Sequence, residues 1–200
     1  MRYLSNLYNL RGIWISLAGL WLWSVPSIML ALDANAILQA HNTYRATHQA
    51  GVLAWSVSLA QAAQNWANTC PSGHSPNRDA GENIRWSSGS ESEVNIVVSW
   101  YNEKSVYERF SSNYTVNYPM TINQFNVDNS NPATMYGHFT QVVWQSTMQL
   151  GCAQATCNTG WRYVTVCQYK PAGNYVGQFL ANVKQPADQL SAPSELRIYE

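Results

Sequence analysis

The segment "QLGCAQATCNTGWRYVTVCQYK", residues 149–170, contains three of the four cysteines and has the pattern of a β-hairpin. Two runs rich in β-branched and small residues flank a turn that contains Asn, Thr and Gly. If Thr159 and Gly160 form the loop, counting outward along both strands places Cys152 opposite Cys167. Residues directly opposite each other on neighbouring strands lie about 4.5–5.5 Å apart, within reach of a disulfide. The pattern therefore predicts a hairpin closed by a Cys152–Cys167 disulfide.

The same register also determines the pairing of Cys70 and Cys157. Cys152 and Cys157 would lie on one strand, roughly 16 Å apart at about 3.3 Å per residue. That distance excludes a bond between them, so Cys70 is left to pair with Cys157. Both assignments depend on the turn, because a slip of one residue would turn the cysteines to opposite faces of the sheet.

The N-terminal residues have the pattern of an export signal. Residues 1–11 carry two Arg and no acid, and residues 12–31 carry no charge. A basic start followed by an apolar run and small residues is typical of a secretory signal peptide, and we place it at residues 1–31 with cleavage between 31 and 36. The alternative is an uncleaved anchor, because about 20 apolar residues can span a bilayer. Cleavage would give a secreted, extracellular protein without a membrane span, or a periplasmic one in a bacterium. Disulfides persist in those compartments.

The composition and length limit the function and the number of domains that can be expected. The chain of 200 residues has a net charge of +0 and 11% charged residues. Because it has no basic excess to neutralise phosphates, it is not expected to bind nucleic acid. The length suits one domain, which we place at residues 35–183, followed by a polar C-terminal tail at 184–200.

The order of elements favours an α+β fold. Helices are predicted at 33–48 with an Asp33 cap, at 56–70 with a Ser56 or Ser58 cap, and at 90–107. The apolar face predicted for the third helix consists of Val94, Val97, Val98 and Tyr101. A short strand is predicted to begin near Glu82. Residues 108–135 are predicted to be mostly irregular, although so long a loop is usually functional or contains short elements. Three strands follow, at 138–145, 150–155 and 162–169, and this order of helices before strands is typical of α+β layering.

Two of the four histidines lie in settings that suggest a cleft. His74 lies in the loop sequence "GHS". His138 is predicted to open a strand, with Gly137 before it allowing close backbone approach. Two glutamates, Glu82 in "GENI" and Glu103 in "WYNE", are candidates to join them. His48 has the pattern of an ordinary surface residue. Only the fold could bring the four side chains together, because no spacing within the sequence does so.

Four segments carry a resemblance to a known family. They are "HNTYR" at 41–45, "GENI" at 81–84, "GHFTQVVW" at 137–144 and "CQYKPAGN" at 167–174. In this order they resemble the signature segments of the CAP superfamily, named after cysteine-rich secretory proteins, antigen 5 and pathogenesis-related 1 proteins. The resemblance extends from about residue 37 to about residue 179. The chain is most similar to compact, single-domain, pathogenesis-related 1-like members.

The resemblance implies a fold and a site. The fold is a three-layer α–β–α sandwich with a central antiparallel sheet. The site is an open cleft that contains two His and two Glu, carried here by His74, Glu82, Glu103 and His138. The family's usual disulfides agree with the pairing derived from the hairpin. The remaining signature residues, for which we expect structural roles, are His41, Asn42, Arg45, Asn83 and Asn174. For His41 we expect a structural role, because a His on the buried face of a helix more often makes structural hydrogen bonds than binds a ligand.

The cleft could bind a divalent metal. Neutral imidazole is a good ligand for zinc and similar ions, so His74 and His138 are the predicted metal ligands. The carboxylates could bind the ion directly or orient the imidazoles. Two His would leave open positions and hold the metal weakly. In the simpler alternative, the four residues form a hydrogen-bonded network that only supports the cleft.

Three functions remain open. The first, which we favour, is a non-enzymatic extracellular binding protein with a divalent metal, a sterol or a fatty acid as ligand, in a defence-like or environmental role. The aromatic-rich residues 106–125 could line an apolar slot, or could pack on the body of the domain. The second is a metal-dependent, protease-like hydrolase, although no Ser-His-Asp set or "HExxH" motif stands out. The third is a module that binds a protein partner through its loops, and the sequence names no such partner. A glycosylation sequon at Asn113 has meaning only in a host that glycosylates secreted proteins.

Overall fold

The computed structural model describes residues 32–76 and 79–190. The predicted signal segment and the last ten residues lie outside this range. Among the described residues, no helix is both long and apolar enough to cross a membrane.

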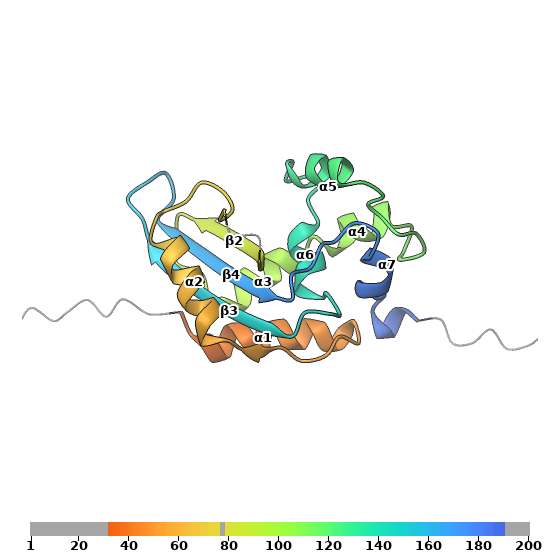
Figure 1. The fold of residues 1–200 in the computed structure, drawn as a ribbon, viewed down its shortest axis with the longest axis horizontal. Coiled ribbons are helices and arrows are strands. Elements are labelled where there is room, and N and C mark those ends of the chain that lie inside the picture. The colour runs from red at the N-terminus through yellow and green to blue at the C-terminus, as the bar shows by residue number, and fades with distance from the viewer. Residues whose placement is uncertain (1–31, 77–78, 191–200) are drawn as a thin grey trace, which may run out of the picture. The chain divides into compact units, whose positions relative to one another are not determined.

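A four-stranded sheet forms the centre of the domain (Figure 1). Its strands are β1 (Ala54–Trp55), β2 (Gly81–Ser87), β3 (Gln149–Thr156) and β4 (Tyr163–Lys170), in the spatial order β1-β3-β4-β2. The three long strands are antiparallel, as expected, and the two-residue strand β1 joins β3 in parallel. Strand β2 is therefore an edge strand, and the cleft forms beside it.

The hairpin has the predicted register. Cys152 lies opposite Cys167, with 4.0 Å between their Cα atoms, and the two form a disulfide. The second disulfide joins Cys70 to Cys157, with Cα atoms 5.7 Å apart. The described part of the chain thus contains both predicted pairs. The first closes the hairpin, and the second ties its tip to the end of helix α2 (Val57–Ala67).

Helices cover both faces of the sheet (Figure 1). Helix α2 buries Ala63 and Ala67 against Ile84 and Val166 on one face. Helices α1 (Ala34–Thr47) and α3 (Glu93–Tyr101) cover the other face. The core on that side contains Ile37, Val97, Trp100, Leu150 and Tyr169. This is the three-layer α–β–α sandwich that the sequence predicted.

The first two helices begin at the predicted caps. Asp33 accepts hydrogen bonds from the backbone N–H groups of Asn35 and Ala36, and Ser56 accepts one from Leu59. Each bond satisfies a donor that has no partner within the helix.

The face predicted for α3 was wrong. The helix is capped by Ser92 and buries Ile96, Val97 and Trp100, whereas Val94 is 50% exposed. Apolar residues occur on more than one side of this helix, so their spacing alone did not identify the buried side.

The segment that carries His138 was also predicted wrongly. Residues 138–145 are not a strand, because Gly137–Val142 forms the short helix α6. Residues 139–144 are all buried, so the segment shows no alternation. A short apolar run of this kind has no period that separates strand from helix.

The segment at 108–135 is more regular than predicted. It contains the end of helix α4 (Lys104–Phe110) and the whole of helix α5 (Ile122–Asn129). Helix α7 (Phe179–Asn182) and the 3-10 helix η1 (Ala187–Gln189) follow the sheet. The start of the predicted tail is attached to the domain, because the backbone oxygen of Lys184 accepts a hydrogen bond from His48 Nδ1.

Candidate functional site

A cleft of about 780 Å³ opens beside the start of β2. One part is formed by the loop that contains His74 and by the first residues of β2. The other part is formed by α5, the start of α6 and the loop at residues 172–175. Three of the four predicted cleft residues, His74, Glu82 and His138, line it directly. Glu103 contacts His138.

Glu103 fixes His138 through three contacts. Its Oε1 lies 2.7 Å from His138 Nδ1. Its Oε2 accepts hydrogen bonds from the backbone N–H groups of His138 and Phe139, at 3.0 and 3.2 Å. Glu103 lies between α3 and α4, so its carboxylate meets the free N–H groups at the start of α6. The Trp100 ring stacks on the imidazole with centroids 6.0 Å apart and further restricts its orientation.

Glu82 holds His74 in a similar way. Glu82 Oε1 lies 2.9 Å from His74 Nδ1 and accepts the backbone N–H of Ser75, also at 2.9 Å. Gln168 Nε2 donates to the other oxygen at 3.3 Å. The His74 side chain is 52% exposed, whereas that of Glu82 is 6% exposed. Burial by itself would raise the pKa of Glu82, but the hydrogen bonds from His74, Ser75 and Gln168 outweigh burial and lower it. Glu82 is therefore a charged acceptor at neutral pH.

Both pairs present the same nitrogen to the carboxylate. A carboxylate accepts a hydrogen bond, so each imidazole carries a proton on Nδ1. In the neutral ring, Nε2 then keeps its lone pair and is free to bind a metal or to accept a proton. The sequence suggested the four residues but not which Glu faces which His.

The side chains do not form a complete metal cage. In the described ranges 32–76 and 79–190, no group of three or more His, Cys, Asp or Glu side chains is placed to hold a metal ion. The cleft instead offers the Nε2 atoms of two imidazole rings, and a carboxylate sets the orientation of each ring.

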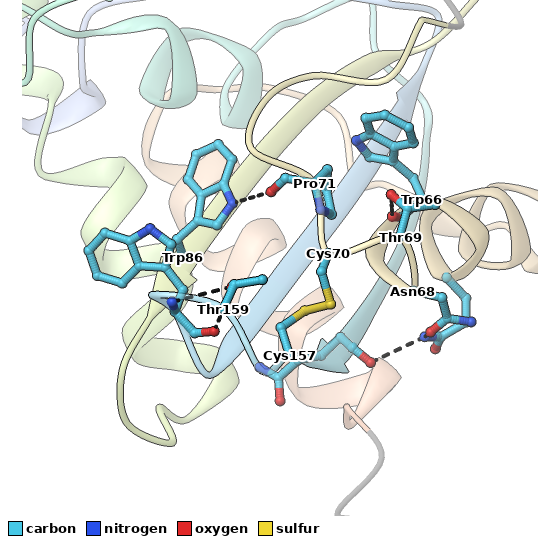
Figure 2. The surroundings of a disulfide bond; sticks show 11 residues. Trp66, Asn68, Thr69, Cys70, Pro71, Trp86, Cys157 and Thr159 are labelled. Carbon is cyan, nitrogen blue, oxygen red and sulfur yellow. Dashed lines mark hydrogen bonds between the residues drawn. A yellow bond between two sulfur atoms is a disulfide. The ribbon is translucent and has the colours of Figure 1, made fainter.

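The loop that carries His74 is held in three places, and Figure 2 shows the disulfide and the hydrogen bond of Trp86. The Cys70–Cys157 disulfide fixes its first residue to the hairpin. Trp86 Nε1 donates to the backbone oxygen of Pro71 at 2.7 Å, and Trp66 Nε1 donates to that of Gly73 at 3.1 Å. Sequence reasoning missed both tryptophans, because neither the spacing nor the composition connects them to this loop.

Two signature residues form a buried network between α1 and the cleft. His41 is fully buried, with Nδ1 2.7 Å from the Ile37 oxygen and Nε2 2.8 Å from the Tyr169 hydroxyl. Burial lowers its pKa to about 4, so the ring is neutral at physiological pH. Asn83 Nδ2 donates to the same hydroxyl and to the backbone oxygen of His138. This network supports the floor of the site.

The other signature residues tie loops to the body of the domain. Asn42 bonds the backbone N–H and oxygen of Leu53. Asn174 accepts from Thr140 Oγ1 at 2.6 Å and donates to the oxygen of Gly137 at 2.9 Å. Arg45 is fully buried, and its guanidinium donates to four backbone oxygens.

His48 is not the surface residue that the sequence suggested. Its side chain is buried, with one ring nitrogen on the Lys184 oxygen and the other 3.0 Å from the Tyr101 hydroxyl. Burial lowers its pKa.

Gln141 is a further cleft residue that the sequence did not identify. It accepts the N–H of Gly173 at 2.9 Å and donates to Thr147 at 3.2 Å. A Cβ on Gly81 would lie 2.0 Å from Gln141 Oε1, so a larger residue there would displace the Gln141 amide from its bonds to Gly173 and Thr147. The glycine at the start of a strand was the available signal.

Comparisons with known proteins agree on one family. The family model described as the cysteine-rich secretory protein family, CAP, matches residues 38–169. A probable pathogenesis-related protein of Arthroderma benhamiae is 35% identical, over 74% of this chain and 48% of the relative. Pathogenesis-related leaf protein 4 of Solanum lycopersicum is 36% identical, over 70% of this chain and 79% of the relative. The chain spans about half the length of the fungal relative.

Two solved structures share the fold. The structure titled Na-ASP-1 aligns with a TM-score of 0.59 and 26% identity, over 78% of this chain and 43% of the other. The structure titled NaASP2 with Zn2+ aligns with a TM-score of 0.55 and 26% identity, over 78% and 87% of the two chains.

Proposed function

Because this chain belongs to the cysteine-rich secretory protein (CAP) family and resembles its pathogenesis-related 1-like members, we propose that it is a secreted, non-enzymatic binding protein whose cleft takes a divalent metal ion. The proposed metal ligands are His74 and His138, and the preferred ions are zinc and copper. The two disulfides suit an extracellular or periplasmic location.

One observation carries this proposal. Two imidazoles line one cleft, each with Nδ1 on a carboxylate, at 2.9 Å for His74 and 2.7 Å for His138. Carboxylate–histidine pairs of this kind orient metal-binding rings and raise their basicity. The same donor set suits zinc or copper better than magnesium or calcium.

The expected affinity is modest. The protein supplies two imidazoles, and water or a bound ligand completes the coordination, so the ion exchanges readily. The structural neighbour NaASP2, 26% identical, is described with Zn2+, which supports zinc as the first ion to test.

The alternatives have less support. All four cysteines are in disulfides, so none is available as a nucleophile for a hydrolase. Much of the aromatic segment at 106–125 packs inward, since Tyr107 and Tyr114 are buried and Phe110 stacks on Tyr118. This favours packing on the body of the domain over an open slot for a sterol or fatty acid. A loop-mediated protein partner stays an alternative without a specific contact behind it.

Calorimetry with zinc tests the proposal. We expect about one ion per chain for the oxidised mature domain and at most weak binding for His74→Ala/His138→Ala. Glu103→Gln should reduce the affinity, because loss of a carboxylate that orients a metal-binding imidazole typically weakens a metal site about 10–100-fold. Trp161→Ala, at the exposed hairpin tip, should bind like wild type. Absence of binding, or binding that survives loss of both histidines, would reject the proposal. Zinc-dependent peptide hydrolysis that is lost with chelator would favour the hydrolase instead.

A further inference from the structure

We propose that the cleft also binds a neutral oligosaccharide, which extends from the part formed by α5 and the loop at 172–175 to the part that contains Ser72 and Trp86. This inference goes beyond metal binding, since it uses other groups and does not require the ion. The polar side chains that line the cleft divide into those that are already hydrogen-bonded within the domain and those that are not.

Some of these side chains form a fixed frame. Asn129 Oδ1 accepts the backbone N–H groups of Tyr136 and Gly137, at 2.9 and 2.5 Å. Asn174 and Gln141 are engaged with Thr140, Gly137 and Gly173, as described above. Because these bonds join α5, α6 and the 172–175 loop, the frame is organised before a ligand arrives, which lowers the cost of binding.

Other polar groups remain available. Asn126 is exposed in the cleft, and its side-chain amide makes no hydrogen bond to any residue in the described part of the chain. The hydroxyl of Tyr175, a side chain that is 52% exposed, and the hydroxyl of Ser72 likewise have no partner among the described residues. An amide and two hydroxyls both donate and accept, as the hydroxyl groups of a sugar do.

Apolar side chains line the same cleft. Phe125 and Trp86 line the cleft, and Ile122 lines it with 60% of its surface exposed. A ligand that matches this arrangement needs hydroxyl groups along its edges and C–H groups on its faces. A pyranose ring has that character, and the aromatic rings provide flat apolar surface for its faces.

Charge argues against other small ligands. Among the described lining residues, the side chains that could be charged near neutral pH are His74, Glu82 and His138, and none is Lys or Arg. A phosphate, a sulfate, a fatty-acid carboxylate or a sulfated sugar would therefore lack a fixed cationic partner. A sterol, with a single hydroxyl, would leave Asn126, Ser72 and Tyr175 unpaired as it displaced their water, which is costly for buried groups.

The test is calorimetry in EDTA with three neutral hexasaccharides: β-1,4-linked glucose, β-1,4-linked N-acetylglucosamine and α-1,4-linked glucose. We expect at least one to bind with a Kd in the range of about 10 μM to 1 mM. Asn126→Ala/Tyr175→Ala should weaken this binding by about tenfold or more. The matched control is Asn113→Ala/Trp161→Ala, which removes an exposed amide and an exposed aromatic ring elsewhere and should leave binding unchanged.

The same experiment separates this inference from the metal proposal. Sugar binding in EDTA that persists in His74→Ala/His138→Ala supports it even if zinc does not bind. Failure of all three sugars at about 5 mM, more than tenfold above a Kd in the middle of the expected range, would overturn it, whether or not zinc binds. Equal loss in the control variant, or no loss in Asn126→Ala/Tyr175→Ala, would also overturn it.

Discussion

At the scale of single residues, the histidines divide into two kinds. His41 and His48 are buried and bonded through both ring nitrogens. His74 and His138 share one nitrogen with a carboxylate and leave the other free. Residue type alone could not separate these kinds, because the separation depends on what lies around each ring.

Stability should fall in mild acid because of the buried histidines. The pKa of His41 is lowered by burial from 6.5 to about 4, so between these values the unfolded chain binds a proton that the folded chain does not. The free energy of unfolding therefore decreases as pH falls through this window, by about 3 kcal/mol for His41, at about 1.4 kcal/mol per pKa unit. Urea unfolding at several pH values measures this slope.

The variant His41→Gln isolates this contribution. Its slope between pH 6.5 and 4 should be shallower than that of wild type. It should not be flat, because burial also lowers the pKa of His48. An unchanged slope would show that His41 is not the group that titrates.

Arg45 should be intolerant of its closest substitution. Its Nε, Nη1 and Nη2 donate to the oxygens of Gly51, Val142, Trp144 and Thr147, at 2.7 to 3.0 Å. The ammonium of Lys cannot reach these acceptors in a planar fork, and a buried acceptor without a donor costs about 1–3 kcal/mol. Arg45→Lys should therefore lose about 3 kcal/mol or more in chemical unfolding. The exposed Arg109→Lys should stay within about 0.5 kcal/mol, and equal losses in the two variants would contradict this account.

At the scale of elements, turn and cap residues predicted strand register and helix starts correctly, whereas apolar runs did not predict the type of element. The Thr-Gly turn gave the correct strand register, and Asp33 and Ser56 gave the correct helix starts. These signals work because a particular side chain or backbone geometry is needed at one position. The apolar run at 139–144 was wrongly predicted as a strand, because a segment that is buried on every side has no apolar period. Helix α5 was missed for the opposite reason, since none of its residues is buried.

Gly151 should control how closely α2 packs on the sheet. A Cβ at this position would lie 2.1 Å from the backbone nitrogen of Ala60 and 2.5 Å from the backbone carbon of Leu59. Gly151→Ala can be accommodated only if α2 moves as a unit, so we expect a loss of about 1–3 kcal/mol in thermal unfolding. Gly160→Ala, with no atom within 4 Å of the added carbon, should change stability by less than about 0.5 kcal/mol. Similar melting temperatures for the two variants would refute this packing constraint.

At the scale of the whole domain, the cleft is a product of connections between distant segments. His74 follows α2, Glu82 lies at the start of β2, Glu103 lies between α3 and α4, and His138 lies at the start of α6. The resemblance to a family named these residues from short motifs. Which Glu faces which His, the walls built by α5 and Gln141, and the tryptophan tethers came only from the folded chain. The partners are not sequence neighbours, since positions 74 and 82 are 8 residues apart and positions 103 and 138 are 35 residues apart.

The two disulfides should therefore differ in what they control. Cys70–Cys157 closes a separation of 87 residues and Cys152–Cys167 one of 15, so loop entropy predicts losses of about 4–5 and about 3 kcal/mol on removal. Only the first bond lies at the start of the loop that carries His74. Cys70→Ser/Cys157→Ser should thus alter the chemical shifts of the His74 ring in NMR spectra, as that loop loosens while its two tryptophan bonds remain. In Cys152→Ala/Cys167→Ala, whose bond lies within the sheet, the same signals should stay near their wild-type positions despite the lower stability. If both pairs changed His74 equally, the disulfide would act on the site through global stability rather than through the loop.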